Sequence, residues 1–155
     1  MKPLENHYDF TVIGRWRNRD NVAKVVEAIR DAGNTCFSFI ENDWSHLKSF
    51  NFSSKQADAD KMMKQTETLS LDSSELKEIF ERDMDGLKNS EKIVLVLPAG
   101  TSSHIEAGVA YGLGKPLYAV AGGGVEVKTE SLYLIFDEIF PSVDEFKKFL
   151  EKGGK

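Results

Sequence analysis

Short apolar runs alternate with helical stripes along most of this 155-residue chain. The runs are continuous rather than alternating, which is typical of strands buried on both faces of a sheet. They lie at 9–14, 34–40, 92–98 and 115–124. Apolar residues three or four positions apart predict helices at 19–33, 72–91, 102–114 and 142–155. This order predicts an α/β fold: a single-domain, Rossmann-like or flavodoxin-like three-layer sandwich with a mostly parallel sheet of four to five strands.

Residues 41–70 interrupt the alternation of predicted strands and helices. They are polar, apart from two patches that carry Trp or Phe and a helical tract around 58–69. A long polar segment within a regular α/β pattern is typical of a functional loop or lid. We therefore expect one domain, residues 1–155, with an insertion or lid at 41–70.

Composition and charge limit the classes of binding partner and the cellular compartment that we expect. A formal net charge of -5 and a pI near 5.3 argue against binding to nucleic acid or to an anionic membrane surface. The single cysteine, Cys36, excludes a disulfide framework and a cysteine-based metal site. No apolar run approaches the ~18 residues of a membrane span, and the first residues lack the apolar core of a signal peptide. These features predict a cytoplasmic protein without a membrane segment.

Three loops follow the predicted strands, and they should share one rim because ligands gather at the carboxyl ends of parallel strands. The loops are "GRWRNRD" (14–20), "PAGTSS" (98–103) and "AGGG" (121–124). The second loop leads into a helix and supplies small residues, hydroxyls and free N–H groups, which suit an anion or a phosphate. The GxGxxG spacing and the P-loop lysine are absent, so the two commonest nucleotide motifs do not apply.

A carboxylate lies on the apolar stripe of the helix that precedes the strongest strand. Leu76, Ile79, Phe80 and Leu87 define that stripe by their spacing, and Asp83 lies on it. A charge on a core-facing stripe is costly unless it is paired or faces a cavity. Asp83 is therefore expected to face a pocket or the sheet edge, or else to cap a helix or pair with a nearby arginine.

A second carboxylate, Glu106, stands almost alone on the apolar helical segment "HIEAGVAYGLGKP" (104–116). One interpretation is a capping box, because Ser103 and Glu106 have the S-x-x-E spacing in which the Glu binds only the N–H of the cap residue. The other is that the helix begins at Thr101 or Ser102, so that Glu106 projects towards whatever the loop binds. The spacing leaves both open.

The tract "RDMDGLKNSEKIVLVLPAGTSSHIEAGVAYGLGKP" (82–116) resembles the nucleoside 2-deoxyribosyltransferase family. In that family an Asp on a helix precedes a buried strand, a loop of small polar residues, and a helix that opens with Glu in an E-x-G-x-A pattern. Asp83 and Glu106 occupy the matching positions here. "VIGRWRN" (12–18) corresponds to the first glycine-bearing loop of the family, so the resemblance covers about two-thirds of the chain, excluding 41–70.

The resemblance implies an enzyme that cleaves the N-glycosidic bond of a (deoxy)nucleoside or its 5′-monophosphate, by hydrolysis or base exchange. Glu106 would be the nucleophile at the anomeric carbon, and Asp83 the acid/base partner that protonates the departing base. A helix start would favour an ionised Glu106, whereas partial burial would raise the pKa of Asp83. A carboxylate pair performs this reaction unaided, so neither a metal nor an organic cofactor is expected.

Departures from the family pattern adjust this expectation. Gly100 stands where the family has an Asp that contacts a sugar hydroxyl, and Val12 and Ile13 replace a tyrosine of the first strand. With the arginines at 15, 17 and 19, these changes resemble the related 2′-deoxynucleoside 5′-phosphate N-hydrolases, in which a small hydroxyl-bearing loop and a basic first loop receive the 5′-phosphate. The substrate-binding residues expected on this basis are Gly14, Arg15, Trp16, Arg17, Gly100, Thr101, Ser102, Ser103 and His104.

The expected partner is a small-molecule nucleoside or nucleotide. The resemblance also implies a homodimer or a higher homo-oligomer, for which the apolar stretch 131–140 is a candidate interface. The competing hypothesis is a non-catalytic module that binds a nucleotide or a nucleotide-derived signal on the same fold. Pocket geometry separates the two, because an enzyme requires that Asp83 and Glu106 face one cavity and that Glu106 is free of a capping interaction.

Overall fold

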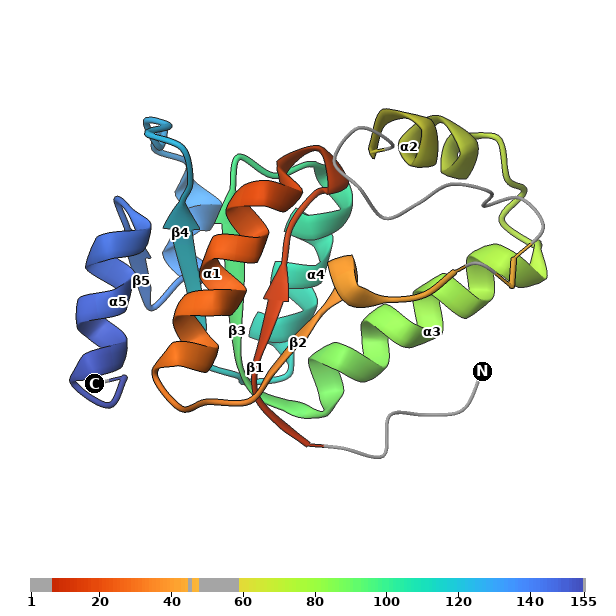
Figure 1. Cartoon of the computed structure of the whole chain (residues 1–155). Helices are drawn as coiled ribbons and strands as arrows, with labels where there is room; N and C mark the ends of the chain where they lie inside the picture. Colours follow the sequence, from red (N-terminus) through yellow and green to blue (C-terminus); the bar gives the residue numbers. More distant parts are fainter. Residues whose placement is uncertain (1–6, 45, 48–58, 155) are drawn as a thin grey trace.

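A parallel β-sheet organises the chain (Figure 1). Within the residues that the computed structural model describes, 7–44, 46–47 and 59–154, the sheet has five strands in the order β2–β1–β3–β4–β5, all parallel. The strands are β1 (Tyr8–Ile13), β2 (Cys36–Ser38), β3 (Ser90–Leu97), β4 (Leu117–Ala121) and β5 (Glu138–Phe140). The predicted α/β sandwich is confirmed, and β5 lies in the apolar stretch near the C-terminus.

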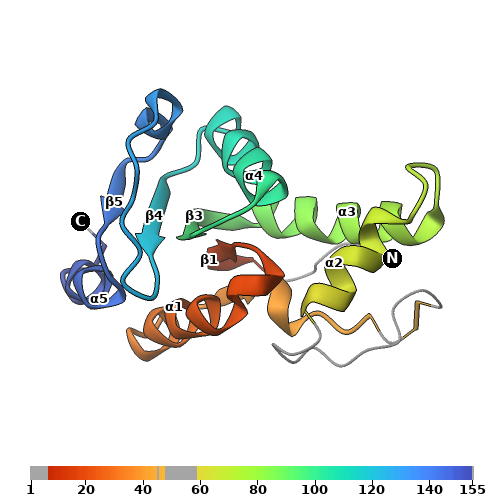
Figure 2. The same ribbon diagram turned by 90° about the horizontal axis from the view of Figure 1, so that it is seen from above.

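Helices cover both faces of the sheet, as Figure 2 shows. The helices are α1 (Arg19–Asp31), α2 (Ala59–Glu67), α3 (Ser74–Lys88), α4 (Thr101–Gly112) and α5 (Val143–Glu151), with short 3-10 helices η1 (Trp16–Asn18), η2 (Phe39–Glu41) and η4 (Ser131–Ile135). Side chains of α1 and α5 pack against one face, and those of α3 and α4 pack against the other. The alternation along β3 reflects this, because Val94 and Val96 belong to the first core cluster and Ile93 and Leu95 to the second.

The helix boundaries follow local sequence signals. The apolar residues whose spacing predicts a helix at 19–33 include Val22, Val25, Val26 and Ile29, and all four are buried. Ser73 caps α3 by accepting the N–H of Leu76 at 3.1 Å, and Ser142 caps α5 by accepting the N–H of Glu145 at 3.2 Å.

The prediction that Phe80 belongs to the buried stripe of α3 is wrong. Phe80 is 61% exposed, whereas Ile79 packs beside Trp44 and Met62, and Leu87 is fully buried. The stripe therefore runs through Ile79, Asp83 and Leu87, because α3 rests on the sheet only towards its C-terminal end.

The sheet changes winding direction between β1 and β3. The chain moves outward from β1 through α1 to β2, and then returns across β1 through α3 to β3. Loops at such a switch point diverge, which leaves a crevice at the carboxyl ends of the two strands. Here the crevice lies between the loop after β1, which contains Gly14 and Arg15, and the loop after β3, which contains Ala99 and Gly100.

The predicted insertion at 41–70 supplies α2, which lies at the end of the sheet where β1 ends (Figure 1). Residues 45 and 48–58 of this insertion lie outside the described residues. Met62 of α2 packs with Trp44, Leu47 and Trp16 in a small apolar cluster of its own. Over the described ranges, no helix is long and apolar enough to cross a membrane.

Candidate functional site

A cavity of about 390 Å³ lies at the switch point between β1 and β3. Asp83 of α3 and Glu106 of α4 both line it. The other lining residues are Gly14, Arg15, Trp16, Phe39, Asn42, Trp44, Met62, Met63, Thr66, Glu67, Ile79, Gly100, Thr101, Ser102 and Ser103. All the residues expected from the sequence contribute except Arg17 and His104.

Glu106 is not part of a capping box. Helix α4 begins at Thr101, and Gly100 is its N-cap residue, without a side-chain capping bond. Glu106 is therefore the sixth residue of the helix, in its second turn, beyond the reach of the cap. Ser103 is buried, and both Ser103 and Glu106 line the cavity. The helix start thus decides between the two interpretations of the S-x-x-E spacing.

Asp83 faces the same cavity from α3. Ile79 precedes it by one turn and packs against the cluster of Trp44 and Met62, and Leu87 follows it by one turn and is buried in the core. No ion pair joins Asp83 to Arg15, Arg17 or Arg82 among the described residues. The alternative that Asp83 serves only to pair with a nearby arginine is therefore not observed.

The two carboxyl groups interact. Burial raises the pKa of Asp83 from 3.8 to about 7. Burial also raises the pKa of Glu106 well above its ordinary value, and the negative charge of Asp83 raises it further. The expectation that a helix start favours the ionised form of Glu106 is wrong, because the helix dipole acts in the first turn and Glu106 lies past it.

The two carboxyl groups of such a pair lose their protons in two separate steps. When one carboxyl ionises, the charge that it leaves opposes ionisation of the other, so the pair retains one proton over a range of pH. The singly protonated pair presents one carboxylate and one carboxylic acid to the same cavity. Such a pair can deliver a nucleophile and a proton to a single bound molecule.

Replacing Asp83 by Asn should stabilise the protein at high pH and change its stability little at low pH. A carboxyl group with a raised pKa in the folded state makes the free energy of unfolding fall as the pH rises from 3.8 to about 7. Asparagine removes that loss. We expect a gain of about 2 kcal/mol near pH 8, roughly half of the full effect of the shift because the cavity admits solvent. For a chain of this length the gain corresponds to roughly 4–8 °C in Tm.

Thermal unfolding followed by circular dichroism near pH 4 and near pH 8 measures this difference. Asp85→Asn, two residues further along α3, is the matched control and should show no pH-dependent change in Tm. An equal change in Tm for Asp83→Asn at both pH values would contradict a raised pKa in the folded protein.

The loop after β1 forms one wall of the cavity. A side chain at Gly14 would clash with Val22, whose Cγ2 lies 2.9 Å from the position of an added Cβ, so the backbone lies close against α1. Arg15 lines the cavity, and its Nε is buried without a hydrogen-bond partner in the part of the chain that the structure describes. Trp16 packs edge-on against Phe39, with the ring centroids 5.2 Å apart. Arg15 is thus the arginine of this loop that reaches the site.

The other two arginines of the loop have different environments. Arg17 donates from Nε to Asp60 of α2 at 2.5 Å, which ties the first loop to the insertion. The guanidinium of Arg19 lies over the Trp16 ring, 5.5 Å from its centroid.

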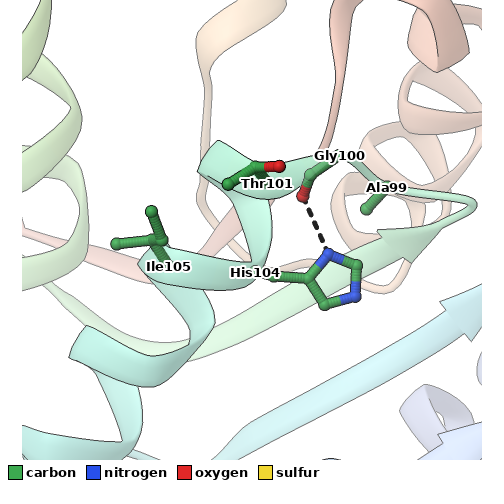
Figure 3. A pocket seen from close by; sticks show the side chains of 5 residues that line it. All are labelled: Ala99, Gly100, Thr101, His104 and Ile105. Atoms are coloured by element: carbon green, nitrogen blue, oxygen red, sulfur yellow. Dashed lines mark hydrogen bonds between the residues drawn. The ribbon is translucent and has the colours of Figure 1, made fainter.

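His104 lies on the other side of the α4 start. It lines a second, open hollow of about 540 Å³ with Ala99, Gly100, Thr101 and Ile105, shown in Figure 3. Gly100 and Thr101 border both spaces. The structure therefore places His104 next to the carboxylate cavity without bringing it into that cavity.

Sequence reasoning missed part of the wall that the insertion supplies. Met62 and Met63 join Trp44 on an apolar side of the cavity, and Asn42 contributes an amide whose Nδ2 is buried without a hydrogen-bond partner among the described residues. The polar appearance of 41–70 hid the methionines and Asn42. The available signal was the pairing of Trp44 with the two adjacent methionines in an otherwise polar segment.

Two further findings bear on the site. No group of three or more His, Cys, Asp or Glu side chains placed to hold a metal ion occurs in the described ranges. The chain matches no protein-family model, and no curated protein matches it in a sequence search.

Proposed function

We propose that this protein cleaves the N-glycosidic bond of a (deoxy)nucleoside or its 5′-monophosphate, in the manner of nucleoside 2-deoxyribosyltransferases and related N-hydrolases. The observation that carries the proposal is the pair Asp83 and Glu106. Both lie in one cavity, with no described hydrogen-bond or ion-pair partner, and the charge of Asp83 acts on Glu106. Perturbed, unpaired carboxyl groups in a cleft are typical of catalytic sites.

The proposed reaction has two steps. The reaction starts from the form of the singly protonated pair in which Asp83 holds the proton and Glu106 is ionised. In the first step a Glu106 carboxylate oxygen bonds to the anomeric carbon, the carbon–nitrogen bond breaks, and its electron pair leaves with the base, which takes the proton of Asp83. In the second step water or a second base attacks the anomeric carbon, and the ester to Glu106 breaks. The Asp83 carboxylate takes the proton released by the attacking group, which restores the singly protonated pair.

The walls of the cavity suit the two ends of such a substrate. Trp16, Trp44 and Met62 offer apolar and aromatic surface for a planar base. The first turn of α4 also lines the cavity and has no side-chain cap, so its N–H groups and the hydroxyls of Thr101 and Ser102 are available to an anion. Arg15 adds a cation to the lining of the same cavity. We propose that the 5′-phosphate, where present, binds there.

The experiment is an assay for released or exchanged base. The full-length protein is incubated with deoxyribo- and ribonucleosides and their 5′-monophosphates, with and without a free acceptor base, and the products are separated by chromatography. Release of base supports the proposal, and dependence on phosphate or acceptor distinguishes hydrolase from transferase chemistry. Ligand-dependent thermal stabilisation without any release would favour the binding module instead.

We also propose that the protein is a cytoplasmic homo-oligomer. Leu132 and Leu134 of η4 are 77% and 89% exposed, which leaves apolar side chains of the stretch 131–140 available to a second copy. Sedimentation velocity should therefore give a mass above that of one chain, and Leu134→Lys should reduce it towards the monomer. A monomeric wild-type protein at micromolar concentration would contradict the proposal.

A further inference from the structure

His104 makes two hydrogen bonds that join distant parts of the chain. Its Nδ1 lies 2.8 Å from the carbonyl oxygen of Gly100, and its Nε2 lies 2.9 Å from the hydroxyl oxygen of Tyr133 in η4. Figure 3 shows the ring turned back towards Gly100, while Ile105 points away from it along α4. The rings of His104 and Tyr133 are nearly parallel, with an angle of 9° between their planes.

These partners define the tautomer of His104. A carbonyl oxygen only accepts, so Nδ1 carries the proton and donates it to Gly100. In the neutral ring Nε2 then has a lone pair, which accepts the Tyr133 hydroxyl proton. Both nitrogens are engaged, so the ring is oriented by its partners on either side.

The Gly100 carbonyl is the point at which the loop becomes a helix. The same oxygen accepts the backbone N–H of His104 at 3.2 Å, which closes the first turn of α4. Gly100 is an N-cap residue without a side chain, so it cannot secure this turn itself. The imidazole supplies a second bond to that oxygen, and Tyr133 anchors the imidazole.

Tyr133 itself is fixed by the core. It packs against the cluster on the α3–α4 face of the sheet, and its ring lies edge-on to the buried Phe136, with centroids 5.4 Å apart. A continuous path of contacts therefore runs from Phe136 through Tyr133 and His104 to Gly100. Glu106 follows in the next turn of the same helix, so its position depends on the position of the first turn of α4.

We propose that His104 and Tyr133 form a positioning pair, which fixes the start of α4 and thereby places Glu106 in the cavity. The inference rests on the proposed function, because the placement matters for attack on the anomeric carbon. His104 does not line the cavity that contains Asp83 and Glu106. It acts through Gly100 and the helix turn.

Tyr133→Phe tests the pair with the smallest change, because it removes one hydroxyl and keeps the ring. We expect kcat to fall roughly tenfold with KM changed less than about twofold, since a small misplacement of a nucleophile slows the chemical step more than binding. Tyr111→Phe is the control: Tyr111 also lies on α4, is 59% exposed, and lines neither space. Unchanged kcat in Tyr133→Phe would overturn the inference.

A double-mutant cycle separates a positioning pair from two independent packing residues. Asn at position 104 can still donate to Gly100, but it does not reach Tyr133. His104→Asn should therefore lose about as much kcat as Tyr133→Phe, and the double variant should lose no more than either single variant. Losses that multiply in the double variant would contradict a shared interaction.

Nitrogen NMR of the full chain gives a readout that needs no activity. The His104 ring, assigned by its absence in His104→Asn, should show a protonated Nδ1 and an unprotonated Nε2. In Tyr133→Phe the backbone amides of His104 and Ile105 should exchange with solvent about 3–10-fold faster, the equivalent of one lost hydrogen bond. An Nε2-protonated ring or unchanged exchange would overturn the positioning role. Absence of base release by the wild type, with both NMR results as expected, would instead contradict the proposed function alone.

Discussion

Glu106→Gln should abolish base release, with kcat reduced by about 10⁴-fold or more. Glutamine keeps the size of the side chain and its place in the second turn of α4. It cannot form the ester with the anomeric carbon, because its amide is a poor nucleophile and a poor leaving group. The loss should appear in kcat for every substrate that the wild type accepts.

The folded state of this variant should not suffer. Burial and the charge of Asp83 raise the pKa of Glu106, so the charged form is unfavourable in the folded protein and a neutral side chain relieves that cost. Loss of activity together with an equal or higher Tm would identify a chemical role. Glu81→Gln, at an exposed position of α3, is the control and should retain activity.

The same variant tests whether the intermediate is covalent. Rapid quenching of the wild type during turnover, followed by peptide mass spectrometry, should find a glycosyl group on the peptide that contains Glu106. The Glu106→Gln variant should show none. Retention of base release within tenfold of wild type in Glu106→Gln would contradict the nucleophile role, and an adduct on another residue would relocate it.

The arrangement of elements could be predicted because its signals are local. The continuous apolar runs of β1 and β3, the stripe of α1, and the serine caps of α3 and α5 each depend on neighbouring residues. Once strands and helices alternate, the parallel sheet and the rim at its carboxyl ends follow from general packing rules. This is why the loops after β1 and β3 were expected together and lie together.

The site was predictable only in part, because cavities depend on contacts between distant residues. The position of Asp83 on the stripe indicated a pocket, but the S-x-x-E spacing left two roles for Glu106 until the start of α4 was known. Phe80 has the spacing of a core residue and is exposed, because α3 extends past the sheet. Nothing near Asn42 in the sequence indicates that η2 ends at the cavity.

The pKa values of Asp83 and Glu106 were also predictable only in part. The sequence suggested opposite environments for the two carboxyl groups, with Glu106 ionised by a helix start. In the structure burial acts on both, and the difference between them arises from their interaction. A property that belongs to the pair cannot be derived from either residue alone.

Asp83→Asn should lower kcat by about 10²–10³-fold for substrates whose base needs a proton to depart. The variant cannot donate the proton to the leaving nitrogen, yet it retains the nucleophile. A substrate whose base is already cationic, such as an N7-methylated purine nucleoside, leaves without a proton. For that substrate we expect Asp83→Asn to lose less than about tenfold, whereas Glu106→Gln remains inactive.

The pH dependence of the two proteins should differ in a direction that the structure fixes. In the wild type the active form holds one proton on the pair, so kcat/KM should rise through about pH 7, where the pair loses its first proton, and fall at a higher pH, where it loses the second. In Asp83→Asn no acid is left to ionise, so the fall at high pH disappears. The rise at low pH remains, because Asp83 is still neutral when the wild-type pair loses its first proton, so its charge does not act on that step. Profiles of kcat/KM from about pH 4 to 10 measure both limbs, with Asp85→Asn as the control. A wild-type profile that Asp83→Asn merely scales down, without moving either limb, would show that the two carboxyl groups do not share a proton during catalysis.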